Sequence, residues 1–140
     1  YAASLLFFLF IIKIGLMISV VQNKYLKLLL LYPVSGYIPA FIQTLFFKPM
    51  FEEGLGNSLK KEISFKHLSV SVIFSFVLSV FLFNLIFAAI YVISVFTISL
   101  IISFGLNKKF NGFNGDTIGF GIETAKLSGL AAGILLISKM

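Results

Sequence analysis

Residues 68–106 read LSVSVIFSFVLSVFLFNLIFAAIYVISVFTISLIISFGL, and none of these 39 residues is charged. A single α-helix of this length would be about 58 Å long, nearly twice the hydrocarbon thickness of a bilayer, which is roughly 30 Å. Asn84 is the only strongly polar residue near the centre of the run. We therefore expect two transmembrane helices, at about 68–84 and 86–106, joined by a tight turn.

The rest of the chain contains three further apolar runs, at about 2–21, 28–47 and 117–138. Each is long enough to cross a bilayer. Charged residues make up only 11% of the sequence, against about 25% in soluble domains. The sequence therefore predicts an all-α fold. We expect residues 1–140 to form one polytopic integral membrane domain, a helical bundle with about five transmembrane helices in contact with the lipid bilayer.

Composition excludes several classes of function. The chain has no cysteine, which rules out disulfides, zinc–thiolate sites and thiol catalysis. Its net charge of +6 comes entirely from lysine, and no base-reading motif accompanies it. We interpret this excess as a topology signal and expect no nucleic-acid partner. The chain starts at Tyr1 without a basic segment, which argues against a signal peptide and suggests that the natural start is missing.

Two features inside the predicted spans have both structural and functional interpretations. Lys13 lies near the middle of the first run. A lysine at mid-span costs about 2.5–3.5 kcal/mol on insertion scales, so it either turns into the bundle, snorkels outward, or faces a polar substrate cavity. The second run contains Pro33 and Pro39, which predict a kink or unwinding near Ser35-Gly36. Such a break either serves packing or contacts a ligand.

The last apolar run combines a packing face with a charged face. Small residues recur every fourth position: Gly121, Ala125, Gly129 and Gly133. This repeat predicts a seam for close helix packing. On another side, Asp116, Glu123 and Lys126 fall within about 80° of one another. Glu123 and Lys126 are three residues apart and can neutralise each other.

The distribution of lysines predicts the orientation. With five spans, segments 48–67 and 107–116 share one side of the membrane. That side carries six lysines: Lys48, Lys60, Lys61, Lys66, Lys108 and Lys109. The other side carries Lys24, Lys27 and Lys139. The positive-inside rule then makes the six-lysine side cytoplasmic. We expect a multi-pass protein of the plasma (inner) membrane with a cytoplasmic active face.

The most polar glycine-rich segment is 107–119, NKKFNGFNGDTIG. Asp116 is the only aspartate in the chain, and its place before the last span suits a helix N-cap. On pattern alone, capping is the favoured role. Phosphoryl transfer with Mg²⁺ generally needs two or more carboxylates. Glu52, Glu53 or Glu123 can complete such a set only if the fold brings them to Asp116.

Two motifs carry a resemblance to a known family. Phe113-Asn114-Gly115-Asp116-Thr117-Ile118-Gly119, followed by Glu123, resembles the C-terminal Gly-Asp-Thr-Leu-Gly signature of cobalamin synthase, also called adenosylcobinamide-GDP ribazoletransferase. Glu52-Glu53-Gly54-Leu55-Gly56-Asn57 resembles that family's loop between hydrophobic segments. Ser35 falls where the family often shows Ser-Arg, with Gly36 in place of the arginine. The resemblance covers essentially the whole chain in order.

The chain also departs from the family pattern. The family's N-terminal Asp-Gly…Asp…Asp-Gly cluster has no counterpart here, and Lys126 stands near where many members have a second glutamate. The resemblance therefore implies a C-terminal portion of the synthase that lacks the aspartate-cluster motif. Its expected protein partners are the missing N-terminal half and other cobalamin-assembly enzymes.

The resemblance also implies a reaction, in which adenosylcobinamide-GDP is joined to α-ribazole or its 5′-phosphate with release of GMP, assisted by Mg²⁺. It implies catalytic roles for Asp116, at the metal or the nucleophile, and for Glu123. The implied substrate-binding residues are Lys108, Lys109, Glu52, Glu53, Asn57 and Ser35. Two other classes stay open. A transporter or permease fragment is indicated by Lys13, Glu123 and the proline-interrupted second run; a non-catalytic membrane remnant would use its charges only for topology.

Overall fold

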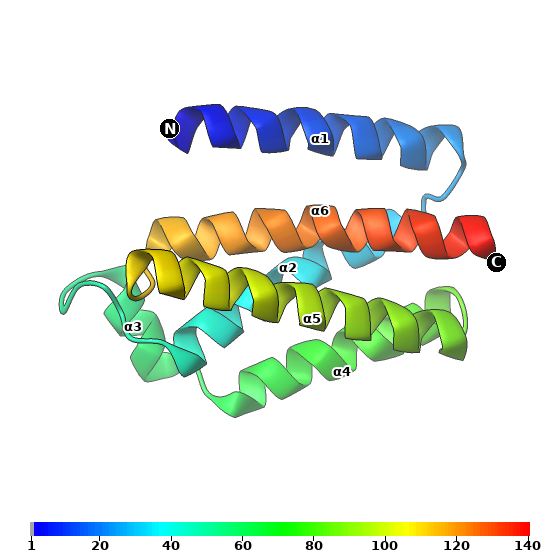
Figure 1. Ribbon diagram of the computed structural model, residues 1–140. Helices are drawn as coiled ribbons and strands as arrows, with labels where there is room; N and C mark the ends of the chain where they lie inside the picture. Colours follow the sequence, from blue (N-terminus) through cyan, green and yellow to red (C-terminus); the bar gives the residue numbers. More distant parts are fainter. Residues whose placement is uncertain (1) are drawn as a thin grey trace.

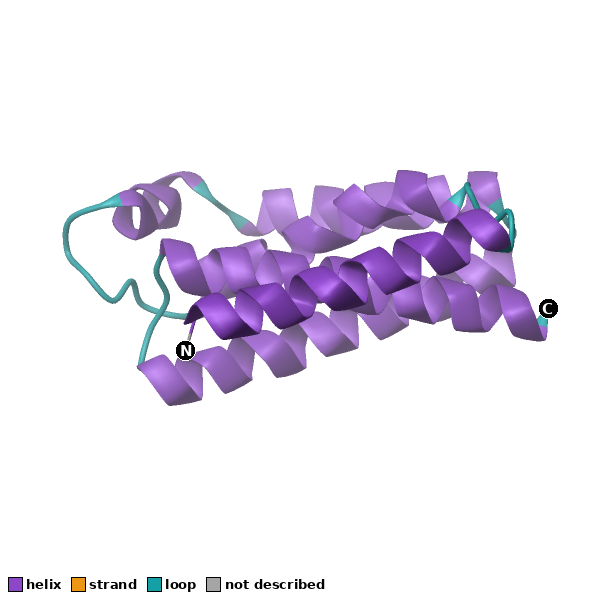
Figure 2. Cartoon of the chain, turned by 90° about the horizontal axis from the view of Figure 1, so that it is seen from above, coloured by secondary structure: helices purple, strands orange, loops and turns teal. Residues whose placement is uncertain are grey.

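The computed structural model describes residues 2–140, which form six helices and, within that range, no strand (Figures 1 and 2). The helices are α1 (Ala2–Gln22), α2 (Leu28–Phe46), α3 (Leu55–Glu62), α4 (Phe65–Leu82), α5 (Leu85–Phe110) and α6 (Gly115–Lys139). All but α3 are long and apolar enough to cross a membrane. The predicted all-α membrane bundle with five such helices is confirmed.

The uncharged run 68–106 forms parts of α4 and α5, which meet at Phe83-Asn84. Asn84 is the N-cap of α5, and its side chain accepts a hydrogen bond of 2.8 Å from the Phe87 amide. This capping bond satisfies one of the amides that a helix start leaves without a partner, so the one strongly polar residue of the run fixes where the chain turns.

Helix α5 continues four residues beyond the predicted end at residue 106 and stops at Phe110. Lys108 and Lys109 therefore lie in its last turn and not in a loop as predicted. Lysines are favourable there because the C-terminal end of a helix carries partial negative charge. The helix ends at Asn111, whose backbone is left-handed at φ 56°, a common way for a helix to stop.

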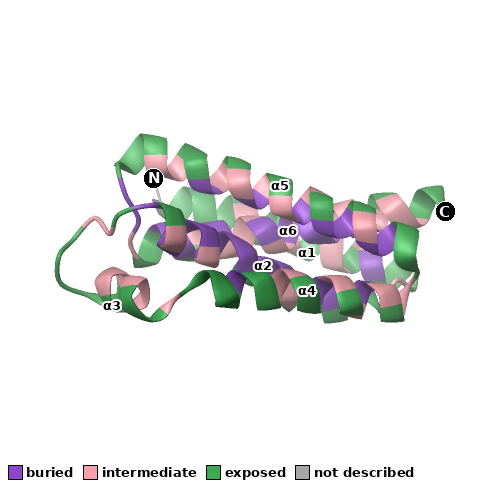
Figure 3. Ribbon diagram, turned by 90° about the horizontal axis from the view of Figure 1, so that it is seen from below, coloured by how far each residue is buried: buried purple, intermediate pink, exposed green. Residues whose placement is uncertain are grey.

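Helix α2 lies at the centre of the bundle and is largely buried (Figure 3). It runs unbroken through Pro33 and Pro39, so of the predicted kink or unwinding near Ser35-Gly36 the unwinding does not occur. Ser35 Oγ donates a 2.9 Å hydrogen bond to the Tyr32 carbonyl. The helix tolerates the prolines because neighbouring helices pack on it along its length.

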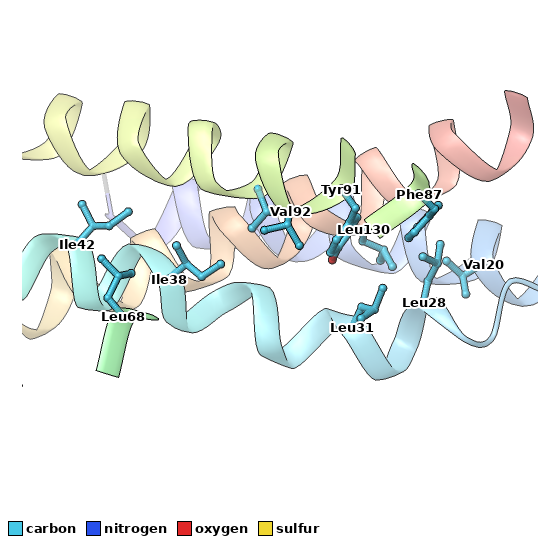
Figure 4. Packing of buried hydrophobic residues seen from close by; sticks show 11 residues of the cluster. Val20, Leu28, Leu31, Ile38, Ile42, Leu68, Phe87, Tyr91, Val92 and Leu130 are labelled. Atoms are coloured by element: carbon cyan, nitrogen blue, oxygen red, sulfur yellow. The ribbon is translucent and has the colours of Figure 1, made fainter. Parts of the chain in front are cut away.

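The main core joins α2 to its neighbours (Figure 4). Leu28, Leu31, Ile38 and Ile42 of α2 pack with Phe87 and Tyr91 of α5 and Leu130 of α6. The small-residue seam of α6 faces α2: a Cβ added at Gly133 would stand 2.6 Å from Leu28 Cδ2, and one at Gly129 3.0 Å from Ser35 Oγ. Only residues without bulk let the two helices approach this closely.

The ends of the helices gather at two ends of the bundle (Figure 1). The start of α1, the α2–α3 loop, α3 and the α5–α6 loop lie at one end, which we call the two-loop end. The α1–α2 and α4–α5 connections lie at the other end. Helix α1 lies beside α6 at the edge, with most of its apolar side chains exposed. The fold thus brings segments 48–57 and 111–116 together.

Candidate active site between two loops

The two polar loops are joined through their backbones. Phe113 N donates to the Lys48 carbonyl (3.0 Å), and Met50 N donates to the Phe113 carbonyl (2.8 Å), forming an isolated parallel bridge between Pro49 and Phe113. The Phe113 side chain is buried in a small cluster with Ala40, Phe47 and Ile118. This anchor fixes the α5–α6 loop against the α2–α3 loop.

Gly112 is required for this pairing. Its φ is +150°, and a Cβ there would lie 2.9 Å from the Lys48 carbonyl oxygen. Only glycine combines this backbone conformation with so close an approach at low cost. The glycine before the Phe113 anchor is therefore a structural requirement of the site.

A cavity of about 220 Å³ opens between the joined loops. It is lined by Pro49, Phe51, Glu53, Gly54, Leu55 and Gly56 from the first loop and the start of α3, and by Phe113, Asn114, Gly115 and Asp116 from the second loop and the start of α6. Two acidic residues, Glu53 and Asp116, thus line one cavity from segments far apart in the sequence. Asp116 is exposed, and its side chain makes no hydrogen bond or ion pair with any residue of the range 2–140.

The N-cap of α6 is Asn114, and the capping role favoured for Asp116 on pattern alone is wrong. Asn114 Oδ1 accepts from the Thr117 amide, and Thr117 Oγ1 accepts from the Asn114 amide, both at 2.9 Å. This reciprocal pair satisfies the helix start. Asp116 is left in the first turn, where the positive helix end favours a carboxylate, and its side chain stays available at the cavity.

Gln43, which the sequence analysis did not single out, supports the site together with Gly121. Gln43 of α2 is buried and donates through Nε2 to the Thr117 carbonyl (3.2 Å), which ties the first turn of α6 to α2. Gly121 leaves room for it, because a Cβ there would lie 2.5 Å from Gln43 Nε2. Only that glycine was predicted, as part of the seam.

Lys60 of α3 caps the C-terminal end of α2. Its ammonium donates to the carbonyls of Thr44, Leu45 and Phe47 at 2.7, 2.8 and 2.9 Å. Burial lowers the pKa of Lys60, while the three carbonyls favour the charged form, which supplies three donors. Lys60 therefore positions α3, and with it one wall of the cavity.

Other predicted residues lie near the cavity without lining it. Asn57 Nδ2 donates to the Glu52 carbonyl (2.6 Å), so both residues shape the first loop. Lys108 and Lys109 are exposed at the end of α5, and the Lys109 ammonium lies 5.5 Å from the centre of the Phe110 ring. These lysines share the two-loop end of the bundle with Asp116.

Two predicted residues lie away from the cavity. Ser35 is buried between α2 and α6 in the middle of the bundle. Glu123 lies two helical turns beyond Asp116, roughly 10 Å further along α6. It pairs with Lys126 (2.9 Å) on its own helix and with Lys13 of α1 (3.4 Å). We call Lys13, Glu123 and Lys126 the charge cluster.

The cavity suits an anionic ligand that brings a cation with it. The described residues contain no group of three histidine or acidic side chains that could hold a metal alone. Mg²⁺ usually needs only one or two protein carboxylates, because waters and substrate phosphates complete its shell. Glu53 and Asp116 fit that pattern, and the amino ends of α3 and α6 at the same cavity favour phosphate.

Five apolar helices of membrane-spanning length, with α2 at their centre and a cavity lined by two acidic residues at one end, indicate a polytopic helical membrane protein. The sequence model of the cobalamin-5-phosphate synthase family matches residues 1–134, and the chain belongs to that family. This membership assigns it to cobalamin biosynthesis. No curated protein and no solved structure gives a significant match.

Proposed function

We propose that this protein acts as a membrane-embedded transferase that joins adenosylcobinamide-GDP to α-ribazole or its 5′-phosphate and releases GMP. The observation that carries the proposal is the convergence of Glu53 and Asp116 on one cavity in a chain of the cobalamin-5-phosphate synthase family. In this reaction a ribazole hydroxyl attacks the phosphorus bound to cobinamide, and GMP takes the electron pair of the broken P–O bond.

The residues at the two-loop end fit the charges of that reaction. Asp116 would orient the attacking hydroxyl or hold the metal, and Glu53 would be the second metal ligand. When bound, Mg²⁺ supplies charge neutralisation on the phosphate oxygens. Lys108 and Lys109 would attract the phosphates to this end of the bundle. Catalysis here depends on positioning, which the backbone pairing of Phe113 with Lys48 and Met50 supports.

The same end carries six of the chain's lysines, and the opposite end carries Lys24, Lys27 and Lys139. We therefore propose that the two-loop end faces the cytoplasm from the plasma (inner) membrane. The family's aspartate cluster has no counterpart among these residues, so we also propose that a segment carrying it completes the metal site.

The test is turnover in membranes of a bacterium that lacks its own cobalamin synthase. Membranes containing this chain, alone or with a co-expressed segment that carries the aspartate cluster, receive adenosylcobinamide-GDP, α-ribazole and Mg²⁺. We expect GMP release and cobalamin product in at least one arm, and loss of both with Asp116→Asn but not with the exposed control Glu62→Gln. Absence of turnover in both arms contradicts the proposal.

The transporter alternative loses one of its supports, because α2 is unbroken. The charge cluster remains its motivation. Uptake of adenosylcobinamide-GDP into sealed proteoliposomes without GMP release would favour transport over transfer. Neither uptake nor turnover would favour a non-catalytic remnant.

A further inference from the structure

A second hollow, a groove of about 510 Å³, runs between α2 and α4, on a different pair of helices from the proposed active site. Its walls are aromatic and apolar: Tyr37 and Phe41 line it from α2, and Phe74 lines it from α4. The Tyr37 and Phe41 rings stack with centres 6.5 Å apart. Tyr37 and Phe74 are each 55% exposed, so both rings are accessible from outside the bundle.

One end of the groove is polar. Lys66 and His67, in the first turn of α4, line it there. The His67 Nδ1 atom accepts a 3.0 Å hydrogen bond from the Ser64 amide, so the neutral ring carries its proton on Nε2, which is left as a donor. The His67 ring centre lies 6.3 Å from that of Phe41, next to the aromatic wall. Lys66 is exposed and has no ion-pair partner within residues 2–140.

We propose that this groove binds one anionic phospholipid, with an acyl chain along the aromatic wall and the phosphate at Lys66 and His67. The inference rests on the membrane embedding proposed above and is independent of the transferase chemistry. An apolar groove with one lysine ammonium and one neutral imidazole donor at its end is complementary to an anionic headgroup attached to a hydrocarbon chain. Lys66 lies in the first turn of a membrane-length helix, which places it at headgroup level, where a lysine is attracted to anionic lipid.

Tyrosine fluorescence provides the test because the chain has five tyrosines and no tryptophan. The whole chain is reconstituted in phosphatidylcholine nanodiscs and titrated with phosphatidylglycerol whose acyl chains carry bromine, a quencher. We expect saturable quenching at a low mole fraction, and Tyr37→Phe should remove that component. Brominated phosphatidylcholine should quench only in proportion to its mole fraction.

Three variants separate charge from space. Lys66→Gln should raise the half-saturating mole fraction about fivefold, the equivalent of about 1 kcal/mol, while the exposed control Lys61→Gln should leave it unchanged. Ser71→Leu should abolish the saturable component, because it fills the groove and keeps the charge. Equal saturable quenching by both lipids, no saturable quenching by phosphatidylglycerol, or equal effects of Lys66→Gln and Lys61→Gln would overturn the proposal. None of these readouts depends on turnover.

Discussion

Replacing Glu123 with glutamine should destabilise the bundle more than removing either of its lysine partners. In the wild type the charge cluster holds two lysines and one glutamate, a net charge of +1. Glu123→Gln leaves two lysines with no counterion and raises that charge to +2. Lys13→Met or Lys126→Met instead leaves one neutral pair, with Glu123 still bonded to the remaining lysine.

The size of the effect follows from the environment. Removing one partner from a buried pair costs about 3–5 kcal/mol, and a lysine at the middle of a membrane helix costs about 2.5–3.5 kcal/mol. The three side chains are 21–35% exposed, so we take the low end and expect about 3 kcal/mol for Glu123→Gln. Each lysine variant should stay within about 1 kcal/mol of the wild type, because it removes the uncompensated charge.

The assay is equilibrium unfolding in mixed micelles, followed by circular dichroism. A loss of about 3 kcal/mol corresponds to roughly a hundredfold change in the folding equilibrium constant. Glu62→Gln, an exposed carboxylate at the end of α3, is the matched control. The double variant Glu123→Gln, Lys13→Met restores a net charge of +1 and should recover part of the loss. The reasoning is refuted if Glu123→Gln behaves like Glu62→Gln, or if Lys13→Met is as costly as Glu123→Gln.

Three further predictions use the same unfolding assay with matched controls. Gly121→Ala should lower the free energy of unfolding by about 1–3 kcal/mol, because its Cβ meets the Gln43 amide. Gly119→Ala, with open space around it, should leave the stability unchanged or raise it. Equal effects of the two variants would contradict the packing of α6 against Gln43. Lys60→Met should lower the free energy of unfolding by about 1–3 kcal/mol, because it leaves three carbonyls without their donor. Lys61→Met should leave it unchanged. An unchanged stability in Lys60→Met would show that water replaces the ammonium. Gly112→Ala should lower the free energy of unfolding by about 1–3 kcal/mol and make the loop at residues 48–54 more sensitive to protease, whereas Gly115→Ala should do neither. Unchanged cleavage in Gly112→Ala would contradict the backbone pairing between the two loops.

Much of the fold could be predicted because hydrocarbon thickness limits helix length. The uncharged run 68–106 had to divide, and Asn84 was the residue able to cap a new helix. The small-residue seam of α6 could also be predicted, since Gly121, Gly129 and Gly133 permit a neighbouring helix to approach closely wherever that helix lies. A kink or unwinding of α2 was predicted from local proline chemistry; the unwinding does not occur, because neighbouring helices pack on α2 and hold it helical.

The site was less predictable because its contacts link distant segments. Nothing in the sequence shows that Phe113 pairs with Lys48, or that Lys13 reaches Glu123. The cap was assigned to Asp116 when Asn114 and Thr117 form the reciprocal pair, since Asn and Asp are nearly equivalent caps by pattern. The family resemblance singled out both loops, which the fold brings together, while Ser35 and Glu123 lie elsewhere in the bundle.

The central claim, that Glu53 and Asp116 form a substrate site at the two-loop end, is tested most directly by binding. Corrinoids absorb visible light, so equilibrium dialysis against nanodiscs holding the whole chain can measure Mg²⁺-dependent binding of adenosylcobinamide-GDP. Losing one charge-assisted contact is worth about 1.5–3 kcal/mol, so Asp116→Asn and Glu53→Gln should each weaken that binding roughly 10- to 100-fold. Glu62→Gln should leave it unchanged. Wild-type affinity in Asp116→Asn would contradict the account.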